Sequence, residues 1–328
     1  MTRATLAELI FVAALAVALA LLAPRLLSMF QVIELSLFAS LAVLALSLSL
    51  VWGFGGLPCF GQAVFFGLGG YAYAIGAINF GDGLAALPLA LAVPAAFAAL
   101  LGLWSFWGRL SEVYFGVVTL TLTLILYKLM VGASGPAWQI GSAHLGGYNG
   151  LPGLPTLHWP GRAEAPLDPI ALFDLALASL AVVYLLLRLL LSSRFGRVLV
   201  AVRENPLRAG LLGYDPRLYR LGALVLGGAI AGHAGMLYAN WGAFVSPEMF
   251  SLATTVQIIA WVLVGGRASL PGAVIGCVGL QLLQARLGTQ QVLDTNLILG
   301  GLLVLFVLAM PSGLVPALSG LVGRWRRP

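Results

Sequence analysis

Leu191–Arg220 reads LSSRFGRVLVAVRENPLRAGLLGYDPRLYR, and the contrast between this stretch and its apolar flanks indicates the fold class of the chain. The stretch is polar and rich in arginine, whereas the apolar runs before and after it are each long enough to cross a bilayer. Together with Arg188 it holds seven of the 17 basic residues of the chain. A short charged helix between two membrane spans cannot be a buried core element. The pattern therefore predicts a cytoplasmic coupling helix on which a partner subunit docks.

One face of this stretch is apolar at helical spacing, at Phe195, Val198, Leu199 and Val202, and then at Pro206 and Ala209. Ser192 or Ser193 can cap the start of the helix, since their hydroxyls accept from free backbone N–H groups. Pro206 cannot continue a helix, so we expect two short helices, the second of which ends at Gly213.

The opposite face of the stretch carries charge, at Arg197, Arg203, Glu204 and Arg208. We expect these four side chains on the aqueous side, where a soluble subunit could meet them. The alternative is a positively charged surface helix that only fixes the topology. Charge alone would serve that role, so Glu204 would then be dispensable.

The composition defines the class of protein. Hydrophobic residues make up 61% of the chain and charged residues 9%, against about 25% charged in a soluble domain. The chain is therefore expected to be an all-α polytopic membrane protein. The net charge of +6 sets orientation rather than nucleic-acid binding, because no basic stripe is interleaved with aromatic residues.

The apolar runs predict about 8–10 transmembrane helices, with ten as the leading count. They are residues 7–24, 31–51, 60–78, 84–105, 113–133, 168–191, 217–240, 252–266, 270–288 and 293–310. A spanning helix needs about 20 residues, so the short run 252–266 and the glycine-rich run 60–78 are the doubtful ones. We expect a broken span near residues 55–78, which is tolerated only where protein or a cavity covers the backbone.

The arginines predict the orientation of a single transmembrane domain over residues 1–328. The coupling segment 192–216 and the short basic tail 318–328 should both face the cytoplasm. The tail carries Arg324, Arg326 and Arg327. An even number of spans lies between the two segments, which is consistent with both segments lying on the same side of the membrane. The loop 134–167 then lies outside, in the periplasm, and both termini lie inside.

The segment around Pro58 and Gly61 is the candidate for a substrate pathway. Glycine and proline weaken the helix there, and Gln62 places an amide near membrane depth. Interrupted spans near the midplane are where transporters bind substrate. The alternative is close helix packing through small residues. The candidate pathway residues of this segment are Cys59, Gly61, Gln62, Phe65, Phe66, Gly69 and Tyr71.

His233 lies in the middle of an apolar span, where an imidazole should face the bundle interior and find a partner. A structural hydrogen bond is the leading interpretation, and a role in the pathway is the alternative. We find no catalytic constellation, no metal-ligand spacing and no phosphate-binding loop, because the one lysine, Lys128, follows Tyr127. We expect no cofactor and no enzyme activity in this chain.

Five ordered motifs carry a resemblance to a known family. They are LPCFGQAVFFG at 57–67, GGYNGL at 146–151, the coupling stretch from Ser193 to Gly213, FVSPE at 244–248, and VGGR at 264–267 followed by PGA at 271–273. Together they resemble the LivM-type permease of branched-chain amino acid ABC transporters, over Leu35 to Val315.

The resemblance implies a heteromeric complex in the bacterial inner membrane. Its partners would be a sister permease, two cytoplasmic ATP-binding subunits, a periplasmic substrate-binding protein and membrane lipid. The residues expected to contact the ATP-binding subunits are Gly196, Arg197, Arg203, Glu204, Asn205, Arg208 and Gly213. Branched-chain amino acids are the leading substrate, and urea, amides or another small organic acid are the alternatives. A gradient-driven secondary transporter is the alternative from another class.

Overall fold

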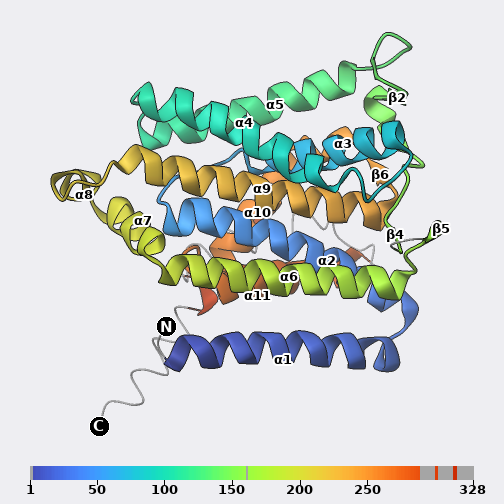
Figure 1. Ribbon diagram of the computed structural model, residues 1–328, viewed down its shortest axis with the longest axis horizontal. Helices are drawn as coiled ribbons and strands as arrows, with labels where there is room; N and C mark the ends of the chain where they lie inside the picture. Colours follow the sequence, from blue (N-terminus) through green and yellow to red (C-terminus); the bar gives the residue numbers. More distant parts are fainter. Residues whose placement is uncertain (1–2, 160–161, 289–299, 302–312, 316–328) are drawn as a thin grey trace.

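The computed structural model describes residues 3–159, 162–288, 300–301 and 313–315, and these ranges form a bundle of roughly parallel helix axes (Figure 1). Eight helices in the described ranges are long and apolar enough to cross a membrane. They are α1 (Arg3–Leu26), α2 (Met29–Leu48, continued by η1, Ser49–Phe54), α3 (Gln62–Phe80), α4 (Leu87–Trp107), α5 (Glu112–Gly132), α6 (Pro169–Ser192), α9 (Pro216–Gly242) and α11 (Leu270–Gly288). The all-α polytopic fold expected from the composition is confirmed.

The expected spans agree with these helices except toward the C-terminal end. The run 252–266 forms α10 (Leu252–Gly265), a helix of 14 residues that is too short to cross a bilayer alone. The expected tenth span, 293–310, and the basic tail, 318–328, lie outside the described residues apart from 300–301.

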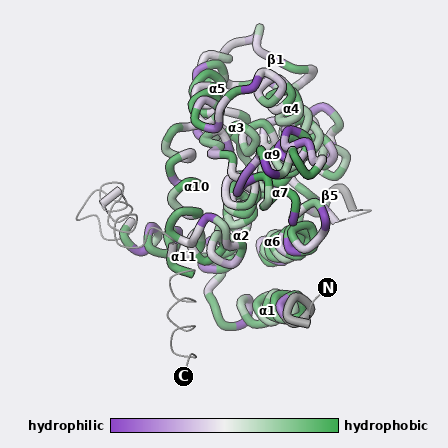
Figure 2. Tube along the Cα trace, turned by 90° about the vertical axis from the view of Figure 1, so that its left-hand side faces the viewer, coloured by the Kyte–Doolittle hydropathy of each residue, from purple (hydrophilic) through white to green (hydrophobic). Residues whose placement is uncertain are grey.

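The centre of the bundle is built from α2, α3 and α9. Of the apolar window of α2 and η1, 83% is buried, against 6% for α1, which places α1 at the periphery. Viewed along the helices, α1 stands apart with α6 as its neighbour, and most residues of the helices are hydrophobic (Figure 2). The carboxylate of Glu8 fastens α1 to α6, because it accepts from Tyr184 Oη and pairs with Arg188 Nη2, both at 2.7 Å.

Glycines let α9 approach its neighbours closely. A Cβ atom placed on Gly69 of α3 would lie 2.2 Å from the Cα atom of Gly232, and one on Gly232 would lie 2.3 Å from the Ala90 carbonyl oxygen of α4. Neither position can therefore carry a side chain, as expected for packing between apolar membrane helices.

The break expected near residues 55–78 lies before α3 rather than inside it. Helix α2 passes into the π-helix η1, residues 55–61 are irregular, and α3 then continues for 19 residues without interruption. The side chain of its first residue, Gln62, donates to the Gly227 carbonyl group of α9. With the rise of an α-helix per residue, Gly227 lies about 16 Å from Pro216, where α9 begins. The irregular segment therefore re-enters the bundle, and α3 begins inside it.

Short strands lie in the segment 134–167, which we expected to be a loop outside the membrane. β1 (Gln139–Ile140) pairs with β2 (Ala143–His144), and β4 (His158–Trp159) pairs with β5 (Arg162–Pro166). β3 (Leu151–Pro152) pairs with β6 (Phe244–Val245), which joins two motifs that are far apart in the sequence. These strands, with η2 (Gly147–Asn149) and η3 (Pro247–Phe250), lie at the end of the bundle opposite α7 and α8 (Figure 1).

Candidate functional site

The arginine-rich stretch forms two short helices that project from one end of the bundle (Figure 1): α7 (Arg194–Glu204) and α8 (Pro206–Leu211). Ser193 caps α7, its hydroxyl accepting from the backbone N–H of Gly196. Asn205 ends α7 and caps α8, since its Oδ1 atom accepts from the Arg208 N–H at 2.9 Å. Gly213 follows with a φ of +88°. The two helical pieces predicted from Pro206 are confirmed.

The apolar face of α7 packs against the bundle, as its spacing predicted. Leu199 and Val202 are fully buried, and Phe195 stacks on the ring of Tyr219 of α9. Gly196 is required by the tight exit from α6, because a Cβ atom there would lie 2.3 Å from the Cα atom of Leu191. The position of α7 is therefore fixed by the spans on either side.

The charged face of α7 and α8 differs from the expectation at one residue. Arg197, Glu204 and Arg208 are exposed, but Arg203 turns inward. Its Nη1 atom donates to the Gly53 carbonyl oxygen of η1 at 2.7 Å, while its Nε and Nη2 atoms donate to Glu204 Oε1 at 3.0 and 2.5 Å. The apolar part of Arg203 also covers Gly56, where a Cβ atom would meet Arg203 Cγ at 2.6 Å. Arg203 is therefore engaged with its own chain, and its side chain is 27% exposed, against 68% for Glu204.

Three leucines that the sequence reasoning missed are exposed on α8 and directly after it. Leu207, Leu211 and Leu212 are 80%, 89% and 76% exposed. Leu207 and Leu211 are four residues apart and so share a face of α8, opposite the buried Ala209. This spacing was the signal available in the sequence. Beside them an open groove of about 850 Å³ runs between α8 and the turn that joins α4 to α5.

A closed constriction lies where the irregular segment meets α3. Cys59, Phe60 and Gln62 face Thr255, Ile258 and Ile259 of α10, with Leu48 completing the wall. The space between them is too small for a water molecule. Two of the expected pathway residues, Cys59 and Gln62, are therefore brought together at one point.

The other expected pathway residues from Gly61 to Tyr71 lie in contacts with neighbouring helices rather than in this constriction. Gly61 rests on the backbone of Thr119 of α5, and Gly69 on Gly232 of α9. The aromatic residues pack edge-on or tilted against neighbouring rings, in the pairs Phe65–Phe97, Phe66–Tyr238 and Tyr71–Phe250. These contacts match the alternative of close packing.

His233 is half-buried on α9 and makes no hydrogen bond within the described part of the chain. It does not line the constriction. The structural hydrogen bond expected for this imidazole is therefore not found among the residues described.

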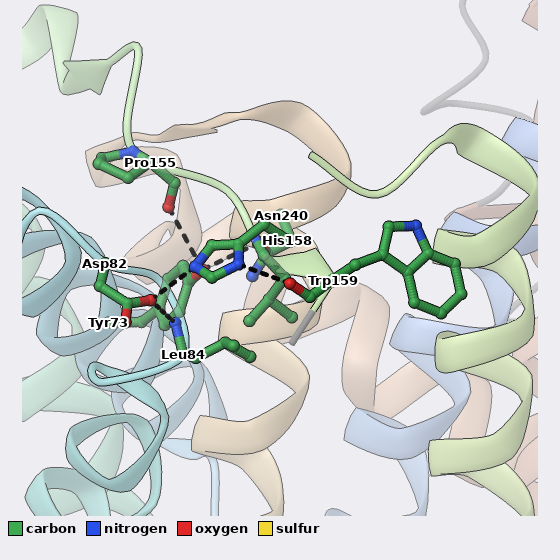
Figure 3. Close-up of polar contacts among 8 residues, drawn as sticks. Tyr73, Asp82, Leu84, Pro155, His158, Trp159 and Asn240 are labelled. Atoms are coloured by element: carbon green, nitrogen blue, oxygen red, sulfur yellow. Dashed lines mark hydrogen bonds and ion pairs between the residues drawn. The ribbon is translucent and has the colours of Figure 1, made fainter. Parts of the chain in front are cut away.

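A polar cluster anchors the strand-containing segment at the other end of the bundle (Figure 3). Asn240 Oδ1 accepts from Tyr73 Oη at 3.0 Å and from the Leu157 N–H at 2.7 Å. Nearby, His158 Nε2 lies 2.9 Å from Asp82 Oδ1, and His158 Nδ1 lies 3.1 Å from the Trp159 carbonyl oxygen. Both ring nitrogens thus face acceptors.

These acceptors stabilise the doubly protonated imidazole. The Trp159 carbonyl group and the Asp82 carboxylate raise the pKa of His158 above its ordinary value of 6.5. The hydrogen bond from His158 lowers the pKa of Asp82 below 3.8, helped by the N–H of Leu84. The sequence reasoning found no role for this pair, because the two residues are 76 positions apart.

Comparison with known proteins gives a consistent result. Residues 31–308 match a family described as the permease component of branched-chain amino acid transport systems. The high-affinity branched-chain amino acid transport system permease protein LivM of Escherichia coli K12 is 30% identical over 300 residues, which cover 84% of this chain and 67% of that protein. A probable LivM protein of Methanocaldococcus jannaschii is 26% identical over 327 residues, which cover 84% of this chain and 90% of that protein.

A second, shorter similarity involves the LivH permease protein of Salmonella typhimurium. It is 34% identical over 126 residues, which cover 38% of this chain and 40% of that protein. No solved structure matches the chain significantly.

Proposed function

This chain belongs to the family of permease components of branched-chain amino acid transport systems, and we propose that it forms half of the translocation pathway of an ATP-driven importer. A sister permease would supply the other half, as the separate LivM and LivH relatives suggest. Two cytoplasmic ATP-binding subunits would hydrolyse ATP, and a periplasmic binding protein would deliver the substrate. The permease itself would carry out no chemical step.

The observation that carries this proposal is the pair of helices α7 and α8. Leu207 and Leu211, which are 80% and 89% exposed on the six-residue helix α8, and Leu212 directly after it, which is 76% exposed, are costly in water. They are surrounded by charged residues, which are unsuited to the lipid interior. Such a surface fits a groove on a soluble subunit, with the leucines as anchors and Arg197, Glu204 and Arg208 at the rim. The ATP-binding subunits are its proposed partners.

The substrate proposal rests on the relatives. The LivM proteins are named for branched-chain amino acid transport, so we propose leucine, isoleucine and valine as the substrates of this chain. The complex would reside in the bacterial inner membrane, with α7, α8 and both termini in the cytoplasm and the segment 134–167 in the periplasm.

The proposal can be tested by measuring the uptake of labelled leucine. The cells used would carry this chain together with the subunits that copurify with it. We expect uptake to stop when ATP is depleted and to persist when an ionophore collapses the proton and sodium gradients. Uptake that follows the gradients instead would favour a secondary transporter. Uptake of urea or an amide in place of leucine would overturn the substrate assignment but retain the ATP-driven class.

A further inference from the structure

The open groove beside α8 is lined by arginine side chains. It has a volume of about 850 Å³ and lies at the end of the bundle where α4 ends and where α5 and α9 begin (Figure 1). Arg109 comes from the turn between α4 and α5, and Arg217 and Arg220 come from the first two turns of α9. Asp215 is the one acidic residue among the described residues of its walls.

Two of these arginines have no anion to pair with. Arg220 pairs with Glu112 of α5. The carboxylate of Asp215 caps α9, since its Oδ1 atom accepts from the backbone N–H of Arg217 at 3.0 Å. The guanidinium groups of Arg109 and Arg217 make no hydrogen bond or ion pair with the described residues. The groove therefore has positive charge available for an anionic ligand.

The backbone of Arg109 is strained. Its φ is +58°, a left-handed conformation that glycine adopts freely and that a residue with a Cβ atom adopts at a cost. Strained residues are common where a protein holds a ligand. Here the strained turn brings a guanidinium group to the wall of the groove.

Exposed aromatic residues indicate the depth of the groove in the membrane. Trp104 and Trp107, in the last turn of α4, are 63% and 43% exposed, and Tyr114, in the first turn of α5, is 67% exposed. Tryptophan and tyrosine are enriched where membrane spans reach the lipid headgroups. The groove lies between the ends of the same helices, so it is at the depth of the phosphate groups of this leaflet.

The groove also has apolar walls. Phe106 and Leu110 line it on the side of α4, and Leu207 and Leu211 line it on the side of α8. A small soluble anion would leave these side chains uncovered, whereas a phospholipid would cover them with an acyl chain. Leu207 and Leu211 are 80% and 89% exposed, so part of their surface can line the groove while the rest remains for a soluble subunit.

We propose that this groove binds an anionic phospholipid of the leaflet on the side of α7 and α8. Arg109 and Arg217 hold its phosphate group, since arginine binds phosphate through two parallel hydrogen bonds, and an acyl chain lies along Phe106 and Leu110. Basic pockets between membrane helices are suited to such headgroups. The inference needs only that the helices cross a bilayer, so it is independent of the substrate and of the energy source.

Lipid binding to the purified complex tests the charge. Native mass spectrometry would follow titrations with phosphatidylglycerol and with zwitterionic phosphatidylcholine. In the double variant Arg109→Gly/Arg217→Gln we expect the affinity for phosphatidylglycerol to fall about thirtyfold, as for the loss of two arginines near a membrane surface, and the affinity for phosphatidylcholine to stay unchanged. Glycine at position 109 also relieves the backbone strain.

Arg194→Gln is the matched control for this titration. Arg194 is an exposed arginine at the start of α7 and does not line the groove. The affinity for phosphatidylglycerol should therefore equal that of the wild type.

A reporter in the groove supplies a second measurement that keeps all the arginines. Gly210 lines the groove, and a Cβ atom there would meet nothing within 4 Å, so Gly210→Cys fits without a clash. Cys59 and Cys277 are buried, so a bimane maleimide should label position 210. We expect phosphatidylglycerol with brominated acyl chains to quench this bimane several-fold more than brominated phosphatidylcholine. Unbrominated phosphatidylglycerol should reverse the quenching, and soluble glycerol phosphate should not.

Four results would overturn the inference. The first is an equal affinity of the double variant and the wild type for phosphatidylglycerol. The second is loss of the ATP-binding subunits from the double variant with lipid affinity unchanged, which would assign the groove to an acidic segment of those subunits. The third is reversal of the quenching by glycerol phosphate, which would show an anion site without a lipid. Should the double variant fail to fold, equal quenching by the two brominated lipids, or quenching by neither, is the fourth.

Discussion

Arg203 Nη1 donates a hydrogen bond of 2.7 Å to the carbonyl oxygen of Gly53 and so joins helix α7 to the π-helix η1. On its other side, η1 is held by Ser49, whose hydroxyl donates to the Arg267 carbonyl oxygen at 3.0 Å. η1 is therefore fixed between α7 and the turn that links α10 to α11. The irregular segment and Gln62 follow directly after it. π-Helices are frequent at functional sites, and this one connects α7 with the constriction.

The first prediction concerns Arg203. In Arg203→Met the link from α7 to η1 is lost, and we expect transport to fall about two- to thirtyfold, the equivalent of roughly 0.5–2 kcal/mol of coupling free energy. The ATP-binding subunits should still copurify, since Arg203 faces inward. Leucine uptake and ATP hydrolysis would be measured together on the same preparations.

Arg194→Met is the matched control for this prediction, because Arg194 is exposed at the start of α7 and lies outside the proposed docking surface. Loss of the subunits from Arg203→Met, with the control unaffected, would show instead that Arg203 contacts them directly.

The second prediction concerns Glu204, which is 68% exposed in its side chain and pairs with Arg203. Glu204→Arg places two guanidinium groups side by side and reverses the charge met by a partner. We expect ATP hydrolysis to be uncoupled from transport, or the ATP-binding subunits to be lost, with membrane insertion unchanged. Wild-type transport together with wild-type retention of these subunits would leave α7 as a topology anchor only.

The third prediction concerns the exposed leucines of α8. Leu211→Asp introduces a charge at the centre of the proposed docking surface, and we expect copurification of the ATP-binding subunits to fall at least about tenfold. Arg194→Gln, an exposed position at the start of α7, is the control and should leave copurification unchanged. Full retention in Leu211→Asp would place the docking surface elsewhere.

The fourth prediction concerns topology. Tyr148→Cys and Leu212→Cys introduce exposed thiols at the two ends of the bundle, whereas the native Cys59 and Cys277 are buried. A membrane-impermeant maleimide added to intact spheroplasts should label position 148 and spare position 212. Labelling of both from the same side would contradict the arrangement of spans between them.

The fifth prediction concerns pH and the pair His158–Asp82. The folded pKa of His158 is raised, so the stability that the ion pair contributes is fully present below pH 6.5 and is lost as the pH rises through the folded value. Asp82 has a lowered pKa, so its share is lost only below pH 3.8. Hydrogen exchange in residues 151–159 should therefore accelerate from pH 6 to pH 8, after correction for the intrinsic rate. In His158→Gln that pH dependence should disappear; its persistence would exclude the pair as the cause.

The sequence was informative where a single residue type dictates the backbone. Pro206 predicted the division between α7 and α8, and the apolar spacing predicted which face of α7 is buried, because both follow from local chain geometry. Gln62 stood out because an amide among apolar residues must find partners. The expected broken span was located near Pro58, although the break proved to precede α3.

The sequence did not predict the features that depend on contacts between residues far apart in the chain. Nothing local to Arg203 shows that its guanidinium reaches a carbonyl group 150 positions away. Phenylalanines such as Phe65 and Phe66 are equally compatible with the wall of a pathway and with a contact between helices. Only the rings that lie next to them in the structure distinguish the two. Two-residue strands such as β3 and β6 are too short for an alternating pattern.

The pairing of Leu151 with Val245 has a consequence for biogenesis. The two residues are about 94 positions apart, so at ribosomal rates of about 5–20 residues per second β3 emerges some 5–20 seconds before its partner. During that interval four further helices, α6, α7, α8 and α9, must be synthesised, and two of them, α6 and α9, must be inserted into the membrane. This end of the bundle is therefore completed only late in translation, and a chain that stalls before Val245 would leave β3 without its partner strand.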